Sequence, residues 1–128
     1  MIAHVVLFTP KRHLTTEARQ SLATAFADAI TKIPSVRRAR IGRRVTHGRP
    51  YEQLMTIDYS HAAIIEFDDL EALKAYLNDP AHERLGAAFF ASFEHAIMYD
   101  FDLDEGDLAL TRLVEDVDED DSSITSHP

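Results

Sequence analysis

The order in which strand-like and helix-like segments follow one another limits this chain to very few folds. Ile2–Thr9 is a short apolar, β-branched run closed by a proline, which is typical of a strand. From Thr15 or Thr16 to Ile33, apolar residues recur at helical spacing until a proline ends the helix. Val36–Val45 alternates weakly and predicts a second strand.

The second half of the domain repeats a strand, a helical region and a strand. Residues 46–58 predict a loop with a glycine and a proline, and Tyr59–Phe67 a third strand. Two helical segments follow, the second over Ala81–Phe93, and a fourth strand covers His95–Phe101. This β-α-β-β-α-β order predicts an α+β, ferredoxin-like fold, in which a four-stranded antiparallel sheet of order 4-1-3-2 carries its helices on one face.

Alternation within the strands places apolar residues on both faces of this sheet. His4, Val6 and Phe8 share one face of the first strand, while Val5 and Leu7 share the other. Helices can cover only one face, and an exposed apolar sheet of this size is rare in monomers. The sequence therefore predicts a homodimer that stacks sheet on sheet.

The charge of the chain is unevenly distributed. Residues 1–101 hold 12 basic and 12 acidic side chains, whereas residues 102–128 hold 10 acids and one base, which accounts for the whole net charge of −9. We therefore expect a domain over 1–103 and an acidic, disordered tail over 104–128, with a short helical stretch near Leu108–Val114. No apolar run is long enough for a membrane helix and the start does not resemble a signal peptide, so a cytoplasmic protein without membrane contact is expected.

One internal segment is basic. Residues 29–51 carry Lys32 and, between Arg37 and Arg49, six arginines, without any acid. Arginines suit a phosphate or carboxylate ligand, but a solvated strand face and loop has the same composition, and we favour this second interpretation. Nucleic-acid binding is not expected, because the acidic tail would compete with phosphate. A further hypothesis is that the tail folds back on the arginines.

Several motifs occur in the order and spacing of a known family. They are His4-Val5-Val6-Leu7-Phe8, Tyr59-Ser60-His61, Tyr76-Leu77-Asn78-Asp79-Pro80-Ala81-His82, Gly86 and Met98-Tyr99-Asp100-Phe101. In these features the first hundred residues resemble the stress-response A/B barrel (Dabb) domain family. Asp79 departs from the pattern, since the family often has histidine there, and the loop before the third strand is longer. The resemblance implies a ferredoxin-like subunit that pairs into a dimeric α/β barrel.

The resemblance also implies functional residues. One branch of the family, the plant polyketide cyclases that include olivetolic acid cyclase, closes a polyketide chain by aldol condensation. A tyrosine and a histidine act there, and they correspond to Tyr76 and His82. Histidines matching His4 and His61 line the same pocket. Many other members have no established activity.

Strand parity places these residues around one cavity. We take the first and third strands as parallel neighbours, so that His4, His61 and Asp100 meet at one end of the sheet. Tyr76 and His82 then lie above them in the helical layer. The expected pocket between sheet and helices has apolar walls, formed by Val6, Phe8, Ala63 and Met98 on the sheet and by Leu22, Phe26, Leu85 and Phe89 on the helices.

In a catalytic site, His82 would be the general base, because an imidazole titrates near neutral pH. Asp100 would orient its ring, and Tyr76 would donate a hydrogen bond to a developing enolate or alkoxide oxygen. No cofactor is required, and no metal is expected, because the ligand spacing is not tight. His82 and Asp100 would serve equally well as a buried polar pair that fixes a helix to the sheet.

Four functions are compatible with the sequence. We favour a homodimer that binds a small apolar or aromatic molecule, since the motif also occurs in members not known to be enzymes. The alternative is a cofactor-free polyketide cyclase or lyase that uses His82 and Tyr76 as base and acid. Cofactor-independent oxygenases and haem-degrading enzymes of similar barrels are disfavoured by the absence of tryptophan. The fourth is a stress-linked interaction protein that acts through its acidic tail.

Overall fold

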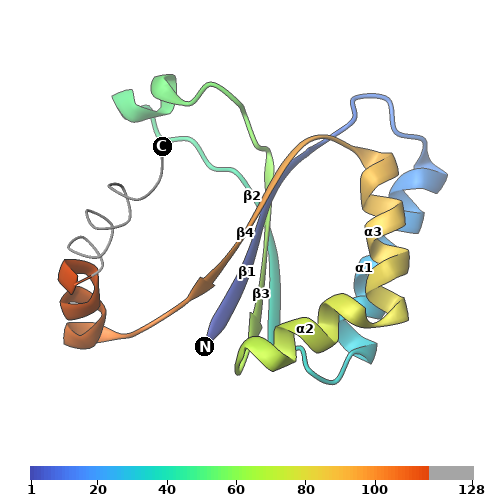
Figure 1. Cartoon of the computed structure of the whole chain (residues 1–128). Helices are drawn as coiled ribbons and strands as arrows, with labels where there is room; N and C mark the ends of the chain where they lie inside the picture. Colours follow the sequence, from blue (N-terminus) through green and yellow to red (C-terminus); the bar gives the residue numbers. More distant parts are fainter. Residues whose placement is uncertain (116–128) are drawn as a thin grey trace, which may run out of the picture.

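A computed structural model describes residues 1–115 of the chain, and in it three helices cover one face of a four-stranded sheet (Figure 1). The strands are β1 (Ile2–Pro10), β2 (Arg38–Arg43), β3 (His61–Phe67) and β4 (Phe93–Asp102). The helices are α1 (Thr16–Lys32), α2 (Leu70–Asn78) and α3 (Pro80–Ser92), and a 3₁₀ turn, η1 (Pro50–Leu54), lies in the loop before β3. A further helix at 106–115 follows β4.

The strands lie in the order β2-β3-β1-β4, and every neighbouring pair is antiparallel. This confirms the predicted ferredoxin-like fold and its strand order. The predicted parallel pairing of the first and third strands is wrong. In the antiparallel register, Phe8 pairs with His61 and His4 pairs with Ile65. His4 and His61 therefore lie at opposite ends of the sheet face that carries the helices.

Capping residues determine where the first two helices begin. The Thr15 hydroxyl accepts a hydrogen bond from the Ala18 amide at 3.0 Å and starts α1. Asp69 starts α2 in the same way, accepting from the Ala72 amide at 2.8 Å. Each of these bonds satisfies an amide that has no partner within the first helical turn, and such a cap contributes about 1 kcal/mol.

The buried core occupies one end of the space between sheet and helices. It consists of Ala29, Ile33, Ile65, Phe67, Leu73, Tyr76, Ala81 and Leu85. Helix α2 lies across this end of the molecule (Figure 1). From this core a cavity extends toward the other end of the sheet, where Phe8, Phe26 and Phe89 are only partly buried.

The second face of the sheet, called the outer face here, is not covered by α1, α2 or α3 (Figure 1). Helices α1, α2 and α3 all lie on the inner side, whereas η1 and the 106–115 helix stand on the outer side (Figure 1). Apolar side chains of β4 remain exposed on the outer face, with Tyr99 at 60% and Phe101 at 50%. Leu7 and Ile64 on the neighbouring strands are partly buried. Both faces are therefore apolar, as the alternation predicts.

Three of the six arginines in the arginine-rich segment form surface ion pairs. Arg37 lies 2.7 Å from Asp68, Arg40 lies 3.0 Å from Glu66, and Arg44 lies 2.6 Å from Asp58. These pairs match the favoured interpretation of a solvated strand face. Exposed pairs of this kind each contribute little to stability.

The described part of the acidic tail includes the predicted helical stretch, since residues 106–115 are helical. Asp104 pairs with Arg112 at 3.1 Å. Among residues 102–115, no acid pairs with the arginine-rich segment. The remainder of the predicted disordered tail, 116–128, lies outside the described residues, so the hypothesis that it folds back on the arginines stays a prediction. None of the helices described here has the length and hydrophobicity to cross a membrane.

Candidate functional site

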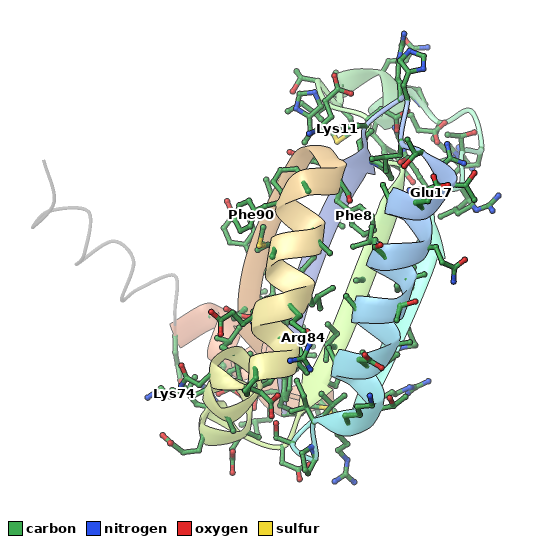
Figure 2. All side chains as sticks on the ribbon, turned by 90° about the vertical axis from the view of Figure 1, so that its right-hand side faces the viewer. Phe8, Lys11, Glu17, Lys74, Arg84 and Phe90 are labelled. Atoms are coloured by element: carbon green, nitrogen blue, oxygen red, sulfur yellow. The ribbon has the colours of Figure 1, made fainter. Side chains whose placement is uncertain are left out.

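A cavity of about 1050 Å³ lies between the sheet and the helices. The eight apolar residues expected around it do line it: Val6, Phe8, Leu22, Phe26, Ala63, Leu85, Phe89 and Met98. Figure 2 views the molecule from the helical side, where α1 and α3 run side by side with Phe8 of β1 between them. The volume is at the upper end of what small-molecule sites occupy.

A break between two helices brings Tyr76 and His82 together. Asp79 ends α2 in an extended conformation and also caps α3, accepting a hydrogen bond from the Ala81 amide at 2.8 Å. Pro80 takes the first position of α3, where its missing N–H costs nothing. As a result, the rings of Tyr76 and His82 meet edge to face with their centres 4.7 Å apart.

Tyr76 is the largest fully buried side chain in the described residues, with 1% of its surface exposed. Its ring also lies against the rings of Phe67 and His4, with ring centres 5.1 Å and 6.2 Å away, respectively. Burial raises the pKa of Tyr76 to about 12, because the phenolate would lose its hydration. The phenol therefore keeps its proton at neutral pH and can donate a hydrogen bond to a molecule in the cavity.

His82 is partly buried beside Tyr76 and lines the cavity. Burial lowers the pKa of His82, and the nearby charge of His4 lowers it further, while the Leu77 backbone and Asp79 act in the opposite direction. At neutral pH the ring is therefore uncharged, and one ring nitrogen can accept a proton or a hydrogen bond.

Asp100 is paired with His4, not with His82. The two residues face each other across β1 and β4, and Nδ1 of His4 lies 2.6 Å from Oδ1 of Asp100. The prediction that both lie on the inner face at one end of the sheet is correct, because side-chain alternation gives the face and the antiparallel direction of β1 and β4 gives the end. The prediction that Asp100 orients His82 is wrong, because the cross-strand neighbour takes the carboxylate. Asp100 is also absent from the residues that line the cavity.

His61 lines the cavity at the opposite end from His4. Its ring stacks on Phe8 with 5.3 Å between centres, and its Nδ1 lies 2.8 Å from the Ser60 hydroxyl. The predicted meeting of His4, His61 and Asp100 at one edge is therefore wrong. Its cause is the parallel pairing assumed for β1 and β3, since reversing one strand exchanges its ends.

The sequence interpretation missed a basic group at the His61 end of the cavity. Arg19 of α1, Arg43 of β2 and Arg44 all line the cavity there. The sequence does contain a signal for Arg43, because alternation along the strand puts it on the same face as Ala39 and Ile41, which also line the cavity. Nothing comparable marks Arg19, which lies in the polar first turns of its helix.

The described site contains polar groups suited to hydrogen bonding and proton transfer. Within residues 1–115, no group of three histidine, cysteine, aspartate or glutamate side chains is arranged to hold a metal ion. The His4 end offers a phenol that donates and an imidazole that accepts, both at the edge of apolar walls. Such an arrangement can orient a small molecule that carries oxygen, or exchange a proton with it.

Comparison with known proteins agrees with this fold. Residues 2–103 match the model of the stress responsive A/B barrel domain. Olivetolic acid cyclase of Cannabis sativa is 20% identical over 100 residues, which cover 78% of this chain and 94% of that protein.

Solved structures show the same architecture. Hydroxynitrile lyase from Passiflora edulis matches with a TM-score of 0.69 and 14% identity, over 82% of this chain and 94% of that one. A dimeric ferredoxin-like protein of Thermobifida fusca matches with a TM-score of 0.61 and 20% identity, over 80% and 90% of the two chains. The family match spans every strand and helix that encloses the cavity, as the motifs from His4 to Phe101 predict. The chain belongs to the stress-responsive A/B barrel domain family.

Proposed function

We propose that this protein is a homodimer that binds a small apolar or aromatic molecule in the cavity between its sheet and helices. The observation that carries the proposal is the cavity itself, about 1050 Å³ in volume, with mainly apolar walls and a few polar groups at its ends. A void of this size exposes apolar side chains to water, and a ligand that covered them would recover the corresponding hydrophobic free energy.

The polar groups at the His4 end would orient such a ligand. The Tyr76 hydroxyl can donate to a carbonyl or phenol oxygen, and the neutral His82 ring can accept from a hydroxyl. Their rings are already in contact, so binding requires little side-chain ordering. A phenol or an enolisable ketone satisfies both groups.

The dimer is supported by the outer face of the sheet. Leu7 has Ala62 and Ile97 as its neighbours on β3 and β4, and all three point away from the helices. The 3₁₀ loop and the 106–115 helix stand on the same side of the sheet (Figure 1). These two segments contain exposed apolar residues, among them Leu54, Met55, Leu110 and Leu113. A second copy would cover this surface, and relatives of this fold are dimeric.

The second candidate is a cofactor-free cyclase or lyase, favoured by the contact between an uncharged His82 and a protonated Tyr76. His82 would take the proton from a carbon between two carbonyl groups. The resulting enolate carbon would form a bond to a distant carbonyl carbon of the same molecule. Tyr76 would give its proton to the oxygen of that carbonyl, and the proton on His82 would restore the phenol. Olivetolic acid cyclase and hydroxynitrile lyase are relatives with enzyme names.

Filling the cavity tests the binding proposal without harming the fold. Gly86 lies in α3, lines the cavity, and has no atom within 4 Å of the position a Cβ would take. Gly86→Leu should therefore occupy the cavity while removing a glycine that destabilises the helix interior. The control is Ala87→Leu, at the next position, which is exposed.

The measurement is thermal stabilisation by 3,5-dihydroxytoluene and by acetylacetone, a phenol and a β-diketone. Wild type and Ala87→Leu should be stabilised, and Gly86→Leu should not. Equal stabilisation of all three proteins would contradict binding in the cavity. For the enzyme candidate, cyclisation of a linear triketone is followed by absorbance. Loss of turnover in both His82→Ala and Tyr76→Phe would support it, whereas unchanged turnover would contradict it.

A further inference from the structure

The cavity has a second polar end that differs in charge from the first. His4 and Phe8 are four residues apart on β1, which corresponds to about 13 Å along a strand. His61 pairs with Phe8, and Arg43 pairs with His61 on the next strand. The arginine end is thus separated from the Tyr76 and His82 end by the length of the cavity.

Two of the arginines at this end have no acidic partner in the described chain. Arg44 is neutralised by Asp58 at 2.6 Å. Arg19 and Arg43 also line the cavity, and neither forms an ion pair with a carboxylate in residues 1–115. A guanidinium keeps its charge at any physiological pH and presents parallel donors to an oxygen anion. The end near His61 therefore carries an uncompensated positive charge.

The orientation of Arg43 distinguishes it from the other arginines of β2. Arg38 and Arg40 have the opposite parity and lie on the outer side of the sheet, where Arg40 pairs with Glu66. Arg43 follows Ala39 and Ile41 on the inner side. An ion pair thus gives the outer Arg40 a partner, whereas the inner Arg43 points into the cavity without one in the described residues.

The wall between the two ends is apolar. Val6, Ile41 and Ala63 lie on the sheet side, with Phe26 and Phe89 opposite. A ligand that spans the cavity must therefore be apolar along its body. An anionic group would be costly against this wall but is favourable at the arginines, where a carboxylate can accept paired hydrogen bonds.

We propose that the ligand is an elongated carboxylate with an apolar body, held by Arg19 and Arg43 at its anionic end and reaching Tyr76 and His82 with its other end. This inference rests on the proposed binding function and names the class of ligand. The carboxylate end sets the direction in which the molecule enters. It also places the opposite end of the ligand beside the pair of residues that can exchange a proton.

The test compares two probes of equal length, decanoate and decan-1-ol, by calorimetric titration at low ionic strength. Wild type should bind decanoate at least about tenfold more tightly than the alcohol. Arg43→Gln and Arg19→Gln should each lower the decanoate affinity about tenfold and leave decanol binding unchanged. Both side chains belong to exposed residues, so the variants should fold. Arg38→Gln, on the same strand but the opposite face, is the matched control and should not alter either affinity.

The outcomes separate this inference from the function on which it rests. If wild type binds decanol and decanoate equally, or if Arg38→Gln weakens decanoate as much as Arg43→Gln does, the anionic subsite is wrong and cavity binding stands. If neither probe binds, the anionic subsite and ligand binding in the cavity are both contradicted. The ring signals of the two histidines supply an independent check by NMR. Decanoate should shift both His61 and His82, whereas the short carboxylate butanoate should shift His61 only; shifts of His82 by butanoate would contradict the proposed direction.

Discussion

His4 and Asp100 form a 2.6 Å hydrogen bond across β1 and β4, although they are 96 positions apart in the chain. The His4 side chain is 10% exposed and the Asp100 side chain 46%. The bond thus joins a nearly buried imidazole to a carboxylate that water still reaches. It ties the first strand to the last one at the end of the sheet where Tyr76 and His82 lie, and it removes the carboxylate from His82.

Asp100→Ala should lower the free energy of unfolding by about 1 kcal/mol, because it leaves a buried ring nitrogen without its partner. The partial exposure of Asp100 keeps the loss at this low value. The control is Asp102→Ala, two positions along the same strand, where the 60% exposed carboxylate lies 3.9 Å from the Met1 amine. Urea unfolding at pH 7 provides the measurement. A loss in the control as large as that in Asp100→Ala would show that the hydrogen bond is not the cause.

His4 also influences the proton affinity of His82. Burial is the main cause of the lowered pKa of His82, and the charge of His4 is the second. His4→Gln removes that charge, so the pKa of His82 should rise part of the way toward its ordinary value. An NMR titration of the His82 ring between pH 4 and pH 8 measures this change. His61→Gln, at the opposite end of the cavity, should leave the titration unaltered, and a rise there as well would argue against a direct effect of His4.

The sequence predicts the faces of the strands well because side chains alternate strictly along a strand. It therefore places His4, Val6 and Phe8 on the helical side and identifies the residues around the cavity. The order of elements likewise suffices for the fold, since few topologies accommodate it.

The wrong predictions concern the direction of the strands and their register, and neither follows from the alternation of side chains along a strand. His61 shares a face with His4 but lies at the other end, because β1 and β3 run in opposite directions. In a sheet of order 4-1-3-2, following the chain through each connection shows that the first and third strands are antiparallel, so the sequence does predict their relative direction. The pairing of Asp100 with His4 depends on the exact register of β4 on β1, and no tight hairpin in the sequence joins these two strands to specify it. The carboxylate that the sequence interpretation gives to His82 is instead bonded to His4.

Tyr76→Phe should change how stability depends on pH in alkaline solution. Burial raises the pKa of Tyr76 to about 12 in the folded protein, against about 10 in the unfolded chain. The unfolded chain therefore loses this proton first as the pH rises, and stability present below pH 10 is lost between pH 10 and pH 12. The loss amounts to about 2 to 3 kcal/mol, since each pKa unit corresponds to about 1.4 kcal/mol. Tyr76→Phe lacks this contribution, so its free energy of unfolding should fall less steeply over that range. Parallel urea curves for both proteins from pH 9 to pH 12 test this, and identical slopes would contradict it.

Leu7→Glu should separate the proposed dimer into single chains. Leu7 lies in the middle of the outer face, between Ala62 and Ile97, and a carboxylate there would be buried without a partner against the second sheet. In a single chain the same carboxylate would reach water, so the subunit itself should stay folded. Leu77→Glu is the matched control, because Leu77 is 40% exposed on α2, on the side of the sheet away from the outer face. Light scattering after gel filtration should give the mass of two chains for wild type and Leu77→Glu and of one chain for Leu7→Glu. Wild type that elutes as a single chain at micromolar concentration would refute the dimer. The exposed Tyr99 and Phe101 would then need another partner, because soluble monomers rarely expose an apolar sheet face of this kind.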